Sequence, residues 1–157
     1  MFEAIQANRI YLREWLPFVD KTRKIADTEA FISAVLSGAD PVFTIWYDGG
    51  FAGLIGFKDY DPDNHKAEIG YWLKEDKQGH GIISQSVEVL LGYGFETMSL
   101  NRIQIKVAVQ NVKSKRVPER LGFKLEGIER DGELLFSREY TDLMVYSKLK
   151  KEMPLKP

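Results

Sequence analysis

The chain contains 157 residues, of which 44% are hydrophobic and 29% are charged, and its net charge is -1. This length and balance predict a single domain, residues 1–157, with a hydrophobic core. The near-neutral charge excludes a generally basic nucleic-acid-binding protein, so no direct nucleic-acid partner is expected. The lack of cysteine excludes disulfides, thiolate metal sites and a cysteine nucleophile, and no metal site is predicted.

Long apolar segments are also absent from the sequence. No apolar run approaches the roughly 18 residues of a membrane span, and the N-terminus lacks the pattern of a signal peptide. Internal repeats and low-complexity linkers are not found. A cytoplasmic protein without a membrane partner is therefore the expectation.

Residues 1–37 are predicted to be mainly helical. Pro17 ends a first short helix, because the residue before a proline is disfavoured in the helical conformation. Asp27 or Thr28 is the candidate N-cap of a second helix. The apolar residues of this second helix recur at helical spacing, and they are Phe31, Ile32, Val35 and Leu36.

An antiparallel meander is predicted next. Two turn signals, Asp48-Gly49-Gly50 and Asp61-Pro62-Asp63-Asn64, separate three extended segments. These segments are Val42–Tyr47, Phe51–Tyr60 and Lys66–Leu73.

The second half predicts a parallel crossover followed by antiparallel strands. One helical face is formed by Ile83, Val87, Leu90, Leu91, Phe95 and Met98. Alternating residues make Arg102–Val109 a strand, so strand, helix and strand form a right-handed parallel unit. A short helix near Lys113–Leu121 ends at Gly122. The last strands are predicted at Phe123–Glu129 and Tyr140–Leu149, with Asp131-Gly132 in the loop between them. The predicted class is mixed α/β.

Residues 78–84, with the sequence QGHGIIS, join the third strand to the long helix. The first N–H groups of a helix lack intrahelical partners, and the helix dipole favours negative charge there. Glycines allow a bulky phosphate to approach those N–H groups closely. The segment therefore predicts a site for a phosphorylated ligand, with a plain strand-to-helix turn as the alternative.

Two common nucleotide-binding loops do not fit this segment. A Walker A loop needs a lysine and a Ser or Thr after its last glycine. A Rossmann fingerprint needs a third glycine at Ser84 and a carboxylate near the end of the next strand, which closes with Val109-Gln110-Asn111. A pyrophosphate held by backbone N–H groups alone remains.

Five motifs lie in register along the chain. They are Glu68–Leu73 (EIGYWL), Gln78–Ile82 (QGHGI), Leu100–Ile103 (LNRI), Asn111 with Ser114 (NxxS) and Glu119–Phe123 (ERLGF). In order and spacing they resemble the GNAT-type N-acetyltransferases over roughly Asn8 to Lys150. The similarity is greatest to the RimJ/RimL branch and its YdaF-type members, a branch that acetylates the N-termini of ribosomal proteins.

The resemblance implies a fold and a cosubstrate. The fold would be a twisted, mostly antiparallel sheet with a central splayed parallel pair, flanked by helices. The cosubstrate would be acetyl-coenzyme A, with its pantetheine arm between the splayed strands and no metal. The cofactor-binding residues would be Trp72, Leu73, Gln78, Gly79, His80, Gly81, Ile82, Ile83, Ser84, Asn111 and Ser114.

Within this set the resemblance implies different parts for different groups. Backbone N–H groups from Gln78 to Ser84 would hold the pyrophosphate, and no acid–base part is expected of the His80 ring. Asn111 would line the far wall of the gap. Backbone N–H groups near Trp72 or Leu73 would stabilise the tetrahedral oxyanion.

Two catalytic residues are implied. Many family members carry a tyrosine seven residues after the asparagine as acid for the thiolate, but Pro118 occupies that position and has no proton to donate. Ser114 matches a serine given this role in the RimL type, so it is predicted as a weak acid or hydrogen-bond donor. Glu68 is the candidate base and would need a raised pKa to work near pH 7.

The predicted reaction is direct transfer in a ternary complex, without an acyl-enzyme. The predicted acceptor is the N-terminal α-amino group of a protein or peptide, such as a ribosomal protein. An α-amino group has a pKa of about 7.7–8.0, against about 10.4 for lysine, so it needs only modest help from a base.

Other interpretations stay open at this point. Glu68 is alternatively a solvated strand residue, Ser114 a helix cap and Asn111 a turn residue. Basic residues at Lys113, Lys115, Arg116 and Arg120 are alternatively phosphate ligands or a solvated helix face. The enzyme is alternatively a small-molecule amine acetyltransferase, acting on a polyamine or aminoglycoside, or the chain is a non-catalytic acyl-coenzyme A-binding module.

The N-terminus departs from the pattern of the resemblance. The family usually begins with a strand and then a helix, whereas Met1 falls inside the expected helix. The first strand is therefore expected to be absent and a sheet edge to be exposed. An exposed edge favours pairing with a second copy, which predicts a homo-oligomer.

Overall fold

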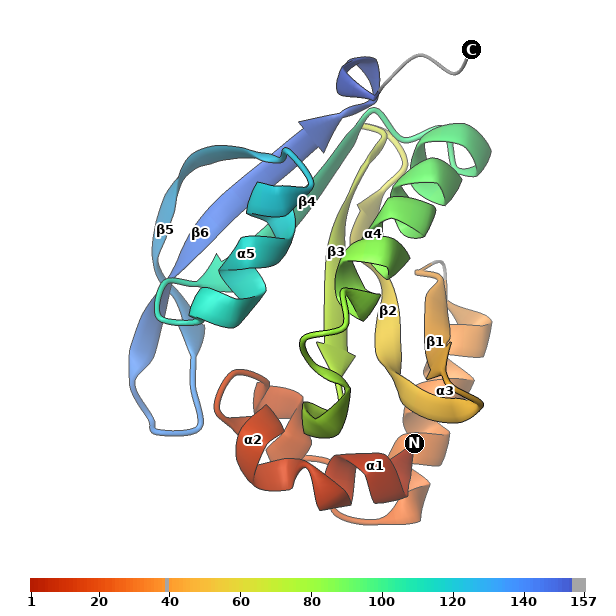
Figure 1. The fold of residues 1–157 in the computed structure, drawn as a ribbon, viewed down its shortest axis with the longest axis vertical. Coiled ribbons are helices and arrows are strands. Elements are labelled where there is room, and N and C mark those ends of the chain that lie inside the picture. Colours follow the sequence, from red (N-terminus) through yellow and green to blue (C-terminus); the bar gives the residue numbers. More distant parts are fainter. Residues whose placement is uncertain (39, 154–157) are drawn as a thin grey trace.

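One six-stranded sheet organises the structure, a computed structural model that describes residues 1–38 and 40–153. The strand order is β1-β2-β3-β4-β6-β5, and every neighbouring pair is antiparallel except β3 and β4 (Figure 1). The strands are β1 Val42–Tyr47, β2 Gly50–Asp61, β3 Lys66–Leu73, β4 Arg102–Ala108, β5 Lys124–Leu134 and β6 Tyr140–Leu149. The predicted mixed α/β class, with one parallel pair, is confirmed.

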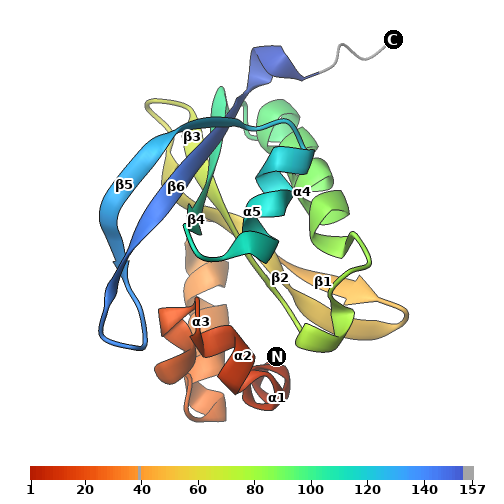
Figure 2. The ribbon, with the colours of Figure 1, turned by 60° about the vertical axis from the view of Figure 1, so that its left-hand side comes forward.

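Helices cover both faces of this sheet (Figures 1 and 2). They are α1 Phe2–Ala7, α2 Arg9–Arg13, α3 Ile25–Ser37, α4 Ile82–Gly92 and α5 Val112–Arg120. The N-terminal helices pack a small core on one face, where Ile5 and Leu12 meet Trp72 of β3. The larger core lies between the sheet and α4 with α5. In the part of the chain that the structure describes, no helix is long and apolar enough to cross a membrane.

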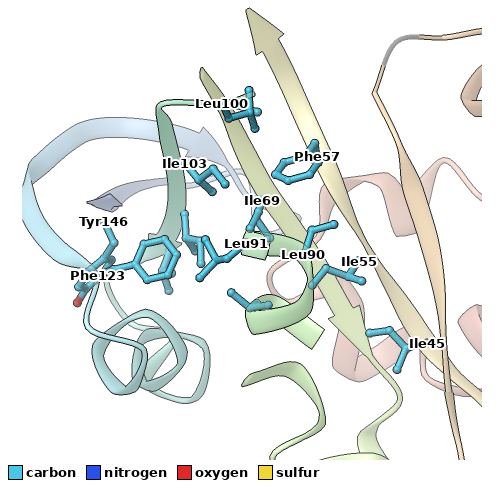
Figure 3. Close-up of a cluster of buried hydrophobic side chains, with 14 of the residues drawn as sticks. Ile45, Ile55, Phe57, Ile69, Leu90, Leu91, Leu100, Ile103, Phe123 and Tyr146 are labelled. Carbon is cyan, nitrogen blue, oxygen red and sulfur yellow. The ribbon is translucent and has the colours of Figure 1, made fainter. Parts of the chain in front are cut away.

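The larger core fixes the positions of β3 and β4 (Figure 3). Alternate residues of these strands point into it, including Ile69 from β3 and Ile103 and Ile105 from β4. The side chains of α4 predicted to face the core do so at Val87, Leu90 and Leu91. Each of these side chains is almost fully buried.

The helical segment after the glycine loop is not one uninterrupted α-helix. α4 ends at Gly92 and continues as a π-helical turn, Tyr93–Thr97. A Cβ atom at Gly94 would lie 2.8 Å from both Ile103 Cδ1 and Phe57 Cζ, so the backbone approaches the core closely there. The turn still buries Phe95, as the helical spacing predicted.

The start of α3 was predicted wrongly. Neither Asp27 nor Thr28 is the N-cap, because the helix begins at Ile25 and Lys24 is the capping position. Asp27 acts from inside the first turn, where its Oδ2 accepts hydrogen bonds from the N–H groups of Arg23 (2.8 Å) and Lys24 (3.0 Å). A carboxylate at the third helical position can satisfy these N–H groups as well as an N-cap can.

The loop predicted at Asp131-Gly132 was also wrong. β5 continues through both residues to Leu134, with its register to β6 shifted between Glu129 and Glu133. Asp131 takes a positive φ of 51°, and its N–H donates to Asp142 Oδ1 across the strands at 2.9 Å. The turn signal therefore marks a β-bulge, which carries Glu133 into the sheet.

Candidate functional site

Two glycines shape the connection between β3 and α4. Gly79 and Gly81 have φ values of 80° and 73°, in the left-handed region that favours glycine. Gly81 caps α4, and the first intrahelical hydrogen bond runs from Gln85 N–H to Gly81 O at 3.0 Å. The N–H groups of the first three helical residues, Ile82, Ile83 and Ser84, precede that ladder. They are oriented to meet an anion at the helix start.

Cations from α5 lie beside this helix start. Lys113 Nζ donates to Gln78 Oε1 at 2.9 Å, and Arg120 Nη1 donates to Ser84 Oγ at 3.3 Å. Both lysine and arginine complement a phosphate group electrostatically. Of the four basic residues considered from the sequence, these two contact the loop and the start of α4.

Gln78 and His80 are held by their own contacts. The Gln78 side chain also donates to the Tyr11 hydroxyl, while its backbone N–H donates to Glu75 O at 3.3 Å. The N–H groups available to a ligand in this arrangement therefore start at Gly79. His80 is exposed, with its ring 5.6 Å from that of Tyr47.

A gap opens between β3 and β4 beside the glycine loop. The two strands pair only from Lys66–Arg102 to Glu68–Gln104, whereas β4 pairs with β6 along its whole length. Beyond Glu68, within the described residues, the edge of β3 that faces β4 has no partner strand. Figure 1 shows the two strands diverging from their shared upper end. The predicted splay is present, and its open backbone edge can hydrogen-bond an extended ligand.

Trp72 and Leu73 lie at the far end of β3, and their side chains are buried on opposite faces. Trp72 joins the small core beneath α1 and α2, and Leu73 joins the larger core. Their side chains therefore fix the strand. Lys74 N–H donates to Ala52 O at 2.8 Å, so by antiparallel alternation the backbone N–H and C=O of Trp72 face β2, and those of Leu73 face the gap.

Asn111 and Ser114 hold the start of α5. Asn111 is the N-cap, and its Oδ1 accepts a hydrogen bond from Ser114 N–H at 3.1 Å. The alternative that Ser114 caps this helix is therefore wrong. The Ser114 hydroxyl instead lies 2.9 Å from the hydroxyl of Tyr71 on β3, across the gap.

Tyr71 was missed in the sequence because its partner, Ser114, is 43 positions away along the chain. Its ring packs against the larger core. Burial raises the pKa of Tyr71 to about 12, and the hydrogen bond with Ser114 offsets a part of that rise. Its hydroxyl therefore keeps its proton throughout the neutral range.

Glu68 is buried and fully engaged. Its carboxylate lies 2.7 Å from Lys58 Nζ and 3.9 Å from Lys106 Nζ, and it accepts a hydrogen bond from Gln104 Nε2 at 3.1 Å. The interpretation of Glu68 as a solvated strand residue is wrong, since it is only 2% exposed. Its contacts tie β2, β3 and β4 together.

Glu133 is a second carboxylate near this cluster that the sequence did not indicate. Burial is the main cause of its raised pKa, the nearby Glu68 adds to the rise, and Lys58 and Lys106 lower it. Among the described residues, no side chain donates a hydrogen bond to Glu133. A half-buried carboxylate with a raised pKa is a suitable general base near neutral pH. The β-bulge that places it was mistaken for a loop.

Acid and base candidates lie on opposite faces of the sheet. Tyr71 packs with the core under α4 and α5 and contacts Ser114. Glu68 is one residue before Ile69, so strand alternation points it to the face of α1 and α2. The two faces adjoin where β3 and β4 are no longer paired.

The face that carries Glu68 is closed at one side by the N-terminal helices. The Arg13 guanidinium lies 3.3 Å from the ring centroid of Phe136, which belongs to the connection between β5 and β6. Arg13 Nη2 also pairs with Asp20 Oδ1 at 2.9 Å. The contact between Arg13 and Phe136 joins α2 to the hairpin of β5 and β6.

Comparison with known proteins gives one family. Residues 1–124 match the family described as "Acetyltransferase (GNAT) domain". The "Putative ribosomal N-acetyltransferase YdaF" of Bacillus subtilis (strain 168) is 41% identical over 158 residues, covering 96% of this chain and 84% of that protein. The "Ribosomal-protein-serine acetyltransferase" of Escherichia coli (strain K12) is 34% identical over 155 residues, covering 95% of this chain and 85% of that protein.

A solved structure shares the same fold. It is the RimL ribosomal L7/L12 α-N-protein acetyltransferase in complex with coenzyme A. The TM-score is 0.87 at 29% identity, and the alignment covers 94% of this chain and 85% of that chain.

Proposed function

Since the chain belongs to the acetyltransferase (GNAT) family, we propose that it transfers an acetyl group from acetyl-coenzyme A to the N-terminal α-amino group of a ribosomal protein. The assignment of acetyl-coenzyme A as the donor rests on the glycine loop beside the gap between β3 and β4. The assignment of a protein N-terminus as the acceptor rests on the relatives, which are named as ribosomal-protein and α-N-protein acetyltransferases. Because ribosomal proteins are made in the cytoplasm, we place the reaction there.

The residues present fit coenzyme A. Gly79 and Gly81 leave room for a pyrophosphate, since a Cβ at Gly79 would meet no atom within 4 Å and one at Gly81 only Gln85 Nε2 at 3.8 Å. Lys113 and Arg120 supply positive charge beside the same N–H groups. The open edge of β3 would hold the pantetheine amides. Among the described residues, no group of three or more metal-ligating side chains occurs.

The reaction that this geometry supports is a direct displacement in a ternary complex. The amine nitrogen attacks the thioester carbonyl carbon, the N–C bond forms, and the C–S bond breaks with its electron pair on sulfur. The amine proton passes to a carboxylate, directly or through water. We assign that role to Glu133 rather than Glu68, because the Glu68 carboxylate is already ion-paired with Lys58 and accepts a hydrogen bond from Gln104.

The leaving thiolate needs only a hydrogen-bond donor. A thiol pKa of about 8.5 makes the thiolate a tolerable leaving group near neutral pH. Ser114 supplies the hydroxyl on the α5 side of the gap. Pro118, in the position of the tyrosine found in many family members, is buried inside α5 and has no proton to donate.

Thiol release tests the proposed function and its alternatives. The chain has no cysteine, so a thiol reagent reports coenzyme A release without background from the protein. With acetyl-coenzyme A we expect turnover of a peptide that begins with the N-terminal residues of a ribosomal protein, and no turnover of spermidine. Turnover of spermidine or an aminoglycoside, without turnover of the peptide, would show that the acceptor is a small-molecule amine and not a protein N-terminus. Coenzyme A binding without turnover of any amine would identify a binding module.

We also predict that the outer edge of β1 pairs with the same strand of a second copy. Among the described residues no strand pairs with this edge, and Val42–Tyr47 contains no charged residue that would repel a copy. Phe43 and Trp46 are 41% and 65% exposed there. Light scattering is expected to show a dimer that Trp46→Lys dissociates and Leu36→Lys, on exposed α3, leaves intact. A wild-type monomer at every concentration would refute this pairing.

A further inference from the structure

The hydroxyl of Tyr71 reaches across the gap to Ser114, and the mechanism above does not use it. Its oxygen lies 2.9 Å from Ser114 Oγ and 3.3 Å from the Ser114 carbonyl oxygen. Tyr71 is fixed by the core on one side, whereas Ser114 is fixed by the Asn111 cap on the other. The two hydroxyls therefore face each other from rigid elements, beside the place proposed for the thioester.

Pro118 explains why the Ser114 carbonyl is available to Tyr71. In an α-helix the N–H group of residue 118 would donate to the carbonyl of residue 114, and proline has no N–H. The Tyr71 hydroxyl lies within reach of the acceptor that this leaves free. The same proline replaces the tyrosine that would serve as acid in many relatives. This chain thus has a phenol near the leaving group, but the phenol comes from β3.

We propose that Tyr71 is a positioning residue that donates its hydroxyl proton to Ser114 Oγ and so turns the Ser114 proton toward the sulfur of the donor. A serine hydroxyl has one proton and can accept two hydrogen bonds. If Ser114 donates to Tyr71, no proton remains for sulfur. The single Tyr71 proton can go to Ser114 Oγ at 2.9 Å or to the Ser114 carbonyl oxygen at 3.3 Å. Donation along the first, shorter contact satisfies both hydroxyls and leaves the serine proton free. This inference rests on the proposed function.

The proton balance is closed without Tyr71 losing its proton. When the C–S bond breaks, its electron pair stays on sulfur, which accepts a hydrogen bond from Ser114. The thiolate takes its proton from solvent after it leaves, because a thiol of pKa about 8.5 is a far stronger acid than the serine hydroxyl. Because the pKa of Tyr71 lies at about 12, Tyr71 remains a donor over the whole assay range.

The bound coenzyme A thiol provides a readout that does not need an acceptor. The chain contributes no thiol. A difference spectrum against the same variant without coenzyme A subtracts tyrosine ionisation, so the remaining ultraviolet change reports the coenzyme thiolate. A hydrogen-bond donor to the thiolate lowers its pKa. We expect the bound thiol to titrate below its usual value of about 8.5 in the wild-type protein. It should titrate higher in both Tyr71→Phe and Ser114→Ala.

The experiment combines this titration with a double-mutant cycle. Tyr71→Phe keeps the ring and removes only the hydroxyl, so the melting temperature and the Kd of coenzyme A should change little. The kcat is expected to fall about tenfold, the effect of losing one hydrogen bond in the transition state. In the Ser114→Ala background the same change should cause no further loss, because the two hydroxyls act as one unit.

Three outcomes would contradict either the positioning role of Tyr71 or the proposed function. An unchanged thiol pKa and kcat in Tyr71→Phe would overturn the positioning role alone. Independent, multiplying losses in the two single variants would do the same. Failure of coenzyme A to bind the wild-type protein would overturn the proposed function and this inference with it.

Discussion

Replacing Glu133 with glutamine is expected to lower kcat/KM for a peptide acceptor by about 100-fold, the lower end of what a general base contributes. Glutamine keeps the shape of the side chain but cannot accept the amine proton. The pH profile gives the sign of the effect. Below the raised pKa of Glu133 the carboxyl is protonated and inactive, so wild-type kcat/KM rises as the pH rises through that pKa. The variant should lose this limb and keep only the rise that deprotonation of the acceptor α-amino group causes near its pKa of about 7.7–8.0.

Glu129→Gln is the matched control for this variant. Glu129 lies on the same strand and pairs with Lys106 at 2.7 Å, but it is exposed. Its replacement should leave kcat/KM within about twofold, as for an exposed ion pair of small free energy. Glu68→Gln decides between the two candidate bases. A larger loss in folded Glu68→Gln than in Glu133→Gln would return the base role to Glu68, as first predicted.

Gly81→Val is expected to weaken coenzyme A binding at least tenfold. The φ of 73° costs an ordinary residue roughly 1–2 kcal/mol, and a β-branched side chain costs more. The backbone would relax toward negative φ and turn the first N–H groups of α4 away from the pyrophosphate. Isothermal titration calorimetry with coenzyme A measures the change in Kd directly.

Gly92→Ala provides the control for the glycine loop. Gly92 lies at the other end of α4 with an ordinary helical φ of -57°, and an added Cβ would meet no atom within 4 Å. Alanine there should stabilise the helix slightly and leave the Kd unchanged. Equal affinity of Gly81→Val and wild-type protein would show that the loop does not hold the coenzyme through its N–H groups.

Alternation and turn chemistry in the sequence predicted most of the sheet. β1, β2 and β3 begin and end within a residue of the predicted segments, because each carries a clear extended pattern between strong turn residues. The crossover from β3 through α4 to β4 followed from the change of period from two to 3.6. The glycine loop followed from its place between a strand and a helix.

Residues whose roles depend on distant partners could not be predicted in the same way. Asp131-Gly132 has the composition of a turn, but Asp142 on the opposite strand converts it into a bulge and so places Glu133. The contact between Tyr71 and Ser114 joins residues 43 positions apart. The lysines near the buried carboxylate of Glu68 belong to β2 and β4. Local patterns carry no information about such contacts.

The site of acetylation tests the central claim most directly. A peptide that begins with serine and also contains an internal lysine is incubated with the protein and acetyl-coenzyme A, and fragment mass spectrometry then locates the product acetyl group. We predict one acetyl group on the α-amino nitrogen and none on the lysine, with no reaction when the N-terminus is blocked. Acetylation of the lysine, or equal reaction of the blocked peptide, would contradict the proposed function.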